Sequence, residues 1–155
     1  MHRKRLRKKE VKKIISEIKE TANVDVPIGD MDVMDFGNIR IVLVNNEPLL
    51  IEYGGKYYVS VYGAIKLRPE KYRVTVDEGA LKFIMNGADV MKPGIVYADE
   101  GIKEGDFVYI TVEGKESPIA VGIALCDGGD MVGGKGKAVK NLHHLKDKIW
   151  KYFYG

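Results

Sequence analysis

The chain of 155 residues has little of what metal, disulfide or thiol chemistry depends on. It contains one cysteine, Cys126, and three histidines. A structural zinc site takes four ligands at short spacings, and a disulfide needs a second cysteine. Cys126 lies in the apolar run AVGIALC, which favours a buried, inert thiol over a nucleophile. The sequence therefore predicts no metal site, no cofactor and no thiol catalysis.

Long apolar runs are also missing. The longest covers residues 118–126, far short of the ~20 residues that a membrane helix needs. Residues 1–19 are highly charged and lack the unbroken apolar core of a signal peptide. Hydrophobic residues make up 45% and charged residues 30% of the chain, as in ordinary folded domains. We therefore expect a soluble, cytoplasmic protein with no membrane partner.

Positive charge is concentrated at one end. The net charge is +3, but residues 1–19 carry +7 and residues 20–155 carry −4. Such a basic end predicts an arm that attracts phosphate or an acidic partner, and a solvated helix face is the simpler alternative. The arm consists of Arg3, Lys4, Arg5, Arg7, Lys8, Lys9, Lys12 and Lys13.

The first half of the chain predicts one helix followed by a small antiparallel sheet. Apolar residues recur at steps of three and four over residues 4–22, which indicates an amphipathic helix. Short polar or glycine turns separate predicted strands at 39–44, 48–53 and 57–62. In the last strand, Tyr58, Ser60 and Tyr62 would share a face, either a platform for stacking bases or, more simply, a second packed face.

The polar, proline-containing stretch 67–71 predicts a boundary between two domains, 1–70 and 71–155. Beyond it we expect a helix that Asp77 caps and that Gly87 closes near Asn86. Short strands are predicted at 72–76, 95–97, 107–112, 118–125 and 137–140, with a turn or short helix over 141–152. This pattern is typical of a small closed β-barrel, so the whole chain is assigned to the α+β class.

No catalytic constellation stands out. The loop 129–136 (GDMVGGKG) resembles a phosphate-binding loop but lacks the final Ser or Thr, so an ordinary connection is preferred. His143 and His144 have no nucleophile assigned to them, and a structural role is the simpler interpretation. The carboxylates of Asp77 and Glu78 fit a helix cap and first turn. We predict no catalytic residues.

The stretch 76–94 (VDEGALKFIMNGADVMKPG) is the most informative. Gly87 and Ala88 would leave backbone N–H groups unobstructed beside a helix end, and Lys82 and Lys92 would flank them. Small residues with bare amides and nearby lysines suit contact with a sugar–phosphate backbone. On physical grounds alone, however, glycines that only satisfy turn geometry remain the better interpretation.

Several motifs together resemble the PUA domain, an RNA-binding β-barrel attached to pseudouridine synthases and archaeosine transglycosylases. They are VDEGA at 76–80, NGADVM at 86–91, Pro93-Gly94, EGD at 104–106, AVG at 120–122 and GKAV at 136–139. The ending NLHHLKDKIW at 141–150 resembles the malignant T-cell-amplified-sequence family of translation factors, whose relatives include ligatin. The resemblance covers residues 72–151, and residues 1–70 match that family's N-terminal domain in length and layout.

The resemblance implies a non-enzymatic RNA-binding protein in translation, acting on the tRNA 3′ end or the small ribosomal subunit. An initiation-factor-like protein is the implied partner. Two alternatives remain: an accessory tRNA-binding subunit of an RNA-modifying enzyme, and a protein-interaction module. The expected RNA-binding residues are Lys82, Asn86, Gly87, Ala88, Asp89, Met91, Lys92, Gly94, Gly136, Lys137 and His144.

Overall fold

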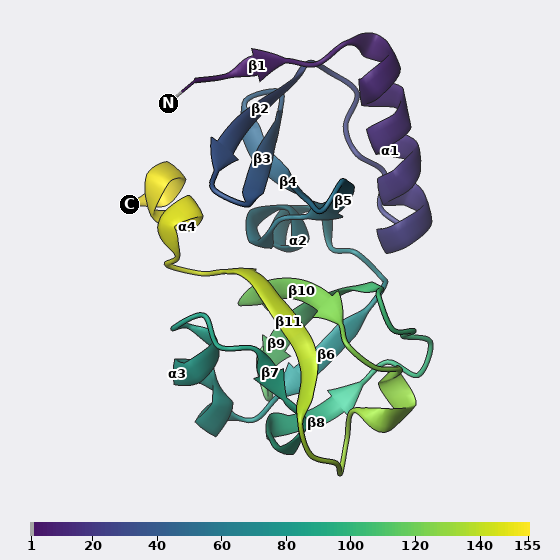
Figure 1. The fold of residues 1–155 in the computed structure, drawn as a ribbon, viewed down its shortest axis with the longest axis vertical. Coiled ribbons are helices and arrows are strands. Elements are labelled where there is room, and N and C mark those ends of the chain that lie inside the picture. The colour runs from purple at the N-terminus through teal and green to yellow at the C-terminus, as the bar shows by residue number, and fades with distance from the viewer. Residues whose placement is uncertain (1) are drawn as a thin grey trace. The chain divides into compact units, whose positions relative to one another are not determined.

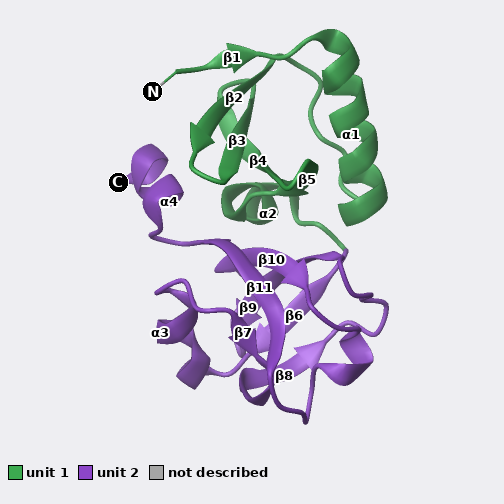
Figure 2. Ribbon diagram, viewed as in Figure 1, with its two compact units in different colours: residues 1–70 green, residues 71–155 purple. Residues whose placement is uncertain are grey.

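The computed structural model describes residues 2–155, and the chain divides into two compact units, Met1–Glu70 and Lys71–Gly155 (Figures 1 and 2). Each unit has its own sheet and its own buried core. Among the described residues, no helix is long and apolar enough to cross a membrane.

Unit 1 is a five-stranded antiparallel sheet with a long helix beside it. The strands follow one another in the order β1-β2-β3-β4-β5. Asn45 and Asn46 join β3 to β4 with φ of 50° and 69°, the left-handed conformations that a tight hairpin turn requires. The elements are β1 (Lys4–Arg5), α1 (Lys8–Ala22), β2 (Met31–Phe36), β3 (Ile39–Val44), β4 (Glu47–Tyr53), β5 (Lys56–Val59) and α2 (Val61–Leu67).

Helix α1 packs one apolar stripe on the sheet. Ile14, Ile18 and Ala22 are buried, as their spacing predicts, and α1 lies next to β5. The predicted helix was wrong at its N-terminal end. Lys4 and Arg5 form strand β1 instead, because they pair with Val33 and Asp32 of β2.

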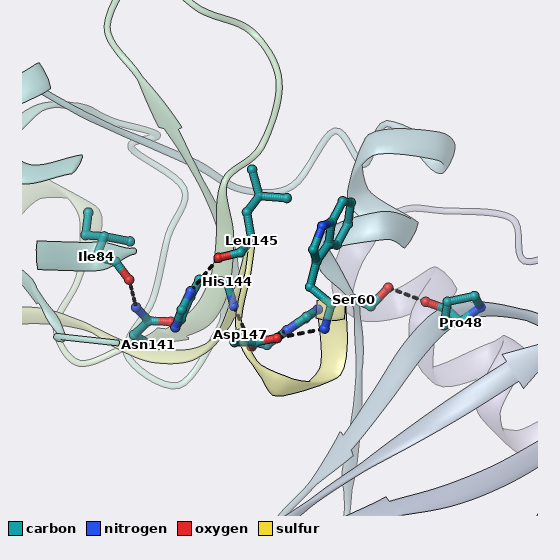
Figure 3. Close-up of polar contacts among 9 residues, drawn as sticks. Pro48, Ser60, Ile84, Asn141, His144, Leu145 and Asp147 are labelled. Atoms are coloured by element: carbon teal, nitrogen blue, oxygen red, sulfur yellow. Dashed lines mark hydrogen bonds and ion pairs between the residues drawn. The ribbon is translucent and has the colours of Figure 1, made fainter. Parts of the chain in front are cut away.

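The predicted strand over 57–62 was also wrong in its second half. Strand β5 ends at Val59, and Ser60 begins α2 by accepting a hydrogen bond from the Gly63 N–H at 2.8 Å. The Ser60 hydroxyl donates to the Pro48 carbonyl at 2.6 Å (Figure 3). Tyr58 is buried and Tyr62 belongs to the helix, so Tyr58, Ser60 and Tyr62 do not share a strand face, either as a stacking platform or as a second packed face.

Unit 2 is a six-stranded, nearly closed barrel in the order β7-β11-β10-β9-β6-β8. Strands β6 and β9 run parallel, and all other pairs are antiparallel. The outermost strands, β7 and β8, are joined directly by the three-residue turn Lys92–Gly94, so the two ends of the sheet come together. The strands are β6 (Arg73–Val76), β7 (Val90–Met91), β8 (Ile95–Ala98), β9 (Phe107–Val112), β10 (Ala120–Ala124) and β11 (Lys137–His144).

Short helical elements connect the strands of this barrel, and one follows the last strand. The predicted helix from Asp77 is a 3₁₀ turn followed by a single α-turn, and the segment beyond Lys140 continues as strand because it pairs with β10. The predicted helix within 141–152 begins only at Lys148. These elements are η1 (Glu78–Ala80), α3 (Leu81–Ile84), η2 (Lys92–Gly94), η3 (Gly128–Asp130) and α4 (Lys148–Tyr154).

The core of unit 2 consists of the inward-facing aliphatic side chains of the barrel. Val74 and Val76 of β6, Ile110 of β9 and Val139 of β11 are fully buried there, with Ile84 of α3 packed on top. The predicted α+β class, with a helix-and-sheet domain followed by a PUA-like β-barrel, is confirmed.

Candidate nucleic-acid interface

A groove of about 690 Å³ lies between α3 and β7 on the surface of unit 2. Its wall begins at Asp77, whose carboxylate accepts a hydrogen bond from the Ala80 N–H at 3.0 Å and so starts η1. The lining residues are Asp77, Gly79, Ala80, Phe83, Ile84, Ala88, Asp89, Val90, Met91, Pro93, Gly94 and Lys137.

Two glycines shape this groove. Gly87 ends α3 with φ of 91°, a conformation that side chains rarely adopt. Gly94 lets η2 approach η1, because a Cβ atom there would lie 3.1 Å from the Ala80 Cβ. The Asp77 N–H donates to the Gly94 carbonyl at 2.9 Å and fixes this approach.

The expectation of free amides at the helix end was wrong. The Gly87 N–H donates to the Ile84 carbonyl at 2.9 Å, and the Ala88 N–H donates to the Phe83 carbonyl at 3.0 Å. These bonds close the helix, so the two amides are already occupied. Gly87 and Ala88 therefore shape the turn at the groove, and their own amides are not available to a phosphate.

Asn141 of β11 holds the end of α3 and the turn after it against the barrel, and Figure 3 shows its contact with Ile84. Its side-chain amide donates to the carbonyls of Ile84 at 3.1 Å and Ala88 at 3.0 Å, and its backbone N–H donates to the Asp89 carboxylate at 2.9 Å. The sequence prediction missed this residue. An asparagine inside a strand, where asparagine is uncommon, is the sequence signal that could have identified Asn141 as a structural contact.

Exposed apolar and basic side chains surround the groove. Phe83 is 57% exposed and Met91 46% exposed. The Lys82 ammonium lies 5.2 Å from the centre of the Phe83 ring. The Lys137 ammonium lies 3.2 Å from an Asp89 carboxylate oxygen. An aromatic face with a cation beside it can stack a base and hold the neighbouring phosphate.

The structure brings most of the expected RNA-binding residues together. Ala88, Asp89, Met91, Gly94 and Lys137 line the groove. Asn86 and Gly87 form the turn beside it, and Gly136 accepts a hydrogen bond from the Lys92 N–H at 2.9 Å. The Lys92 side chain extends away from the groove lining and passes close to Gly134. A Cβ atom at Gly134 would lie 3.0 Å from the Lys92 Cδ.

His144 faces the turn of the groove. Its Nδ1 lies 2.7 Å from the Leu145 carbonyl oxygen (Figure 3). Since a carbonyl only accepts, Nδ1 carries the proton. Its Nε2 would lie 3.6 Å from a Cβ atom at Gly87, so a side chain at that position would contact the imidazole.

His143 has a structural role. It is 2% exposed, and its Nδ1 lies 2.6 Å from an Asp147 carboxylate oxygen. Burial raises the pKa of Asp147, but the hydrogen bond and charge of His143 and the N–H groups of Trp150 and His144 outweigh it, so the pKa lies below its ordinary value. The Asp147 carboxylate also begins α4 by accepting from the Trp150 N–H at 2.9 Å.

The basic arm of unit 1 is partly neutralised by neighbouring acids. Arg3 and Arg5 pair with Asp32 at 3.8 Å and 2.6 Å, and Arg5 also pairs with Asp30 at 3.3 Å. Arg7 precedes α1 and is exposed, as are Lys8, Lys9, Lys12 and Lys13 on the helix itself.

The glycine-rich loop is not a phosphate-binding loop of the nucleotide-hydrolase kind. That motif needs a helix directly after it, and strand β11 begins at Lys137 instead. Cys126, next to this loop, is partly buried, and burial raises the pKa of its thiol. Across residues 2–155, no group of three or more His, Cys, Asp or Glu side chains is placed to hold a metal ion.

Two family models match the chain, one in each unit. A PUA domain matches residues 72–145, and a domain of unknown function, DUF1947, matches residues 2–67. The solved structure of a hypothetical protein of Pyrococcus horikoshii is 40% identical, with a TM-score of 0.85, and the match covers 97% of this chain and 99% of that one. A conserved PUA domain protein of Thermoplasma acidophilum is 30% identical with a TM-score of 0.81, covering 98% and 99%.

Curated relatives extend beyond archaea. An uncharacterised protein of Methanocaldococcus jannaschii is 46% identical over 95% of this chain and 94% of its own length. Translation machinery-associated protein 20 of Schizosaccharomyces pombe is 32% identical over 70% of this chain and 63% of its own. Human eukaryotic translation initiation factor 2D is 27% identical over 73% of this chain but only 20% of its own. The chain thus belongs to the family of PUA-domain proteins in which a DUF1947 domain precedes the PUA domain, and these translation-related proteins are its relatives.

Proposed function

We propose that this protein is a non-enzymatic RNA-binding protein of the translation machinery. In this proposal the groove between α3 and β7 holds the end of a structured RNA, either the 3′ end of a tRNA or a segment of the small ribosomal subunit. The observation that carries the proposal is the exposed Phe83 ring beside this groove with Lys82 next to it. Relatives named as translation proteins support the cellular setting.

Recognition in the groove would rest on stacking and charge. A terminal base would stack on Phe83 and contact Met91, which presents a flexible apolar surface. Lys82 and Lys137 would meet the adjoining phosphates, and Lys92 would contribute from the side of the glycine-rich loop. Asn86, Gly87, Ala88, Asp89, Gly94, Gly136 and His144 would set the shape of the groove.

The basic arm would add attraction at longer range. Exposed lysines of α1 raise the association rate and the affinity for any polyanion without choosing a sequence. The protein would act in the cytoplasm, with the ribosome and an initiation-factor-like protein as partners.

Fluorescence anisotropy with a labelled mature tRNA tests the proposal. We expect Phe83→Ala to weaken binding by about tenfold, since stacking on one base contributes ~1–3 kcal/mol. Lys82→Ala should weaken binding by ~1 kcal/mol and lower the slope of log Kd against log salt by up to about one unit.

Val96→Ala is the matched control. Val96 is an exposed apolar residue on β8 of the same unit, outside the groove lining, so its loss should leave the affinity unchanged. Equal affinity of wild type, Phe83→Ala and Lys82→Ala would contradict the groove assignment. Restoration of activity to a purified RNA-modifying enzyme would instead favour the role of an accessory subunit.

A further inference from the structure

Unit 1 carries a second groove, of about 890 Å³, which the proposed function does not use. It runs along the flank of α1 that carries Lys8, Val11, Lys12 and Ile15, next to the buried stripe of the helix. Aliphatic side chains form most of it, with Leu6 and Met31 buried at its base and Val11 and Ile15 partly exposed along the helix. Ile28 completes the groove from the loop between α1 and β2.

Ile28 is held in an exposed position by its own loop. The side chain is 91% exposed, whereas Val24 and Val26 before it are buried. The Ile28 carbonyl accepts a hydrogen bond from the Asn45 side chain at 3.2 Å. Gly29 packs so closely on Asn45 that a Cβ atom would lie 1.9 Å from its side-chain oxygen. The backbone therefore holds an aliphatic side chain in water at the edge of an apolar groove, as a docking anchor requires.

The charge at the groove is uneven. Three acids line the groove: Asp25 pairs with Lys19 at 3.2 Å, Asp30 pairs with Arg5 at 3.3 Å, and Glu20 lies in the last turn of α1, at the opposite end of the helix from Lys8. Lys8 and Lys12 also line the groove, and within the described part of the chain neither makes an ion pair. The N-terminus of α1 adds its partial positive charge at the same end. This end is therefore complementary to carboxylates.

We propose that this groove binds a short amphipathic segment of a partner protein, with aliphatic side chains on one face and Asp or Glu at one end. The aliphatic face would pack on Val11, Ile15 and Ile28, and the carboxylates would meet Lys8 and Lys12. A protein segment fits better than RNA because no aromatic side chain lines the groove, so bases have nothing to stack on. The inference does not depend on the RNA-binding proposal, which concerns unit 2.

The test uses the full chain and a fluorescein-labelled synthetic helix of about 15 residues, with leucines at positions i, i+3, i+4 and i+7 and glutamates at one end. Anisotropy should give saturable binding with a Kd of about 10 µM. Ile28→Ser should weaken binding at least about tenfold without lowering the melting temperature, because the side chain is already exposed. A peptide with lysines in place of glutamates should not bind.

Two double variants separate the groove from general electrostatics. Lys8→Glu/Lys12→Glu should weaken peptide binding at least about tenfold. Lys9→Glu/Lys13→Glu changes the charge equally on the same helix but outside the groove lining, and should change the Kd less than about twofold at ~150 mM salt.

Four results would overturn the proposal. The first is absence of saturable binding, and the second is a Kd that Ile28→Ser does not change. The third is competition by a single-stranded oligonucleotide that depends on Lys8 and Lys12, which would assign the groove to RNA. The fourth is self-association in sedimentation that Ile28→Ser abolishes, which would assign the groove to a second copy of the chain.

Discussion

Replacement of Asn141 by alanine should loosen the RNA groove and destabilise unit 2. The substitution removes the two hydrogen bonds from the side-chain amide to the Ile84 and Ala88 carbonyls. Each such bond contributes about 1 kcal/mol net, so the free energy of unfolding should fall by about 2 kcal/mol. For a chain of this length that corresponds to a lower melting temperature by about 4–8 °C.

The orientation of the Asn141 amide supports this estimate. Two carbonyl oxygens face its NH₂ group, so a rotated amide would set oxygen against oxygen. Asn141→Asp should therefore destabilise at least as much as Asn141→Ala, because a carboxylate would face both carbonyls and the carboxylate of Asp89. Asn86→Ala, in the same turn but with an exposed side chain, is the matched control.

Thermal unfolding followed by circular dichroism measures these differences directly. The control Asn86→Ala should melt within about 1 °C of wild type. If Asn141→Ala also melted within that interval, the amide would not hold the turn in place, and our account of how the groove is shaped would be refuted.

Other predictions concern stability. Asp147→Ala should lower the free energy of unfolding by about 1–2 kcal/mol in urea titrations, since α4 loses its cap and buried His143 loses its partner. Because the folded pKa of Asp147 is lowered, its contribution is present above its ordinary pKa and lost as the pH falls through the folded value, so the variant should lose less stability in acid than wild type. Gly122→Ala should destabilise by about 2 kcal/mol or more, because its Cβ atom would lie 2.1 Å from the Lys140 carbonyl oxygen. Gly114→Ala should lower the free energy of unfolding by about 1 kcal/mol, because a Cβ atom there would meet no neighbour but the φ of 83° is unfavourable for alanine.

Sequence patterns predicted those structural features that depend on residues close together in the chain. The spacing predicted a packed face of five apolar residues on α1. Ile14, Ile18 and Ala22 are buried as expected, whereas Val11 and Ile15 at its edge are only partly buried. The position of Asp77 before a helical turn correctly predicted a cap. Both depend on contacts within three or four residues, which sequence periodicity describes well.

Elements that depend on distant partners were missed. The sequence of helix α2 resembles the end of a strand. The helix forms where Gly63 packs directly on the Leu49 carbonyl, since a Cβ atom at Gly63 would lie only 2.0 Å from that oxygen. Strand β2 carries Asp32 and Asp35 among its apolar residues, so its pattern was not read as a strand, although Asp32 is satisfied by Arg5 once β1 pairs with it. In both cases tertiary contacts override local preference.

The candidate site shows the same division. The motif around Gly87 and Lys82 could be found in the sequence, but the contact from Asn141 to Ile84 joins residues 57 positions apart. The sequence also could not show that the Gly87 and Ala88 amides are occupied by the Ile84 and Phe83 carbonyls. As a result, these two amides are not the free backbone donors that the sequence suggested.

The most direct test of RNA-end binding is the affinity for one mature tRNA with and without its 3′ CCA, measured by anisotropy across a salt series. Our account predicts submicromolar binding that weakens by about tenfold or more when the CCA is removed, and a Phe83→Ala variant that no longer distinguishes the two tRNAs. Equal affinity for both tRNAs, falling steeply with salt, would show that only the basic arm is engaged and would contradict the assignment of the groove.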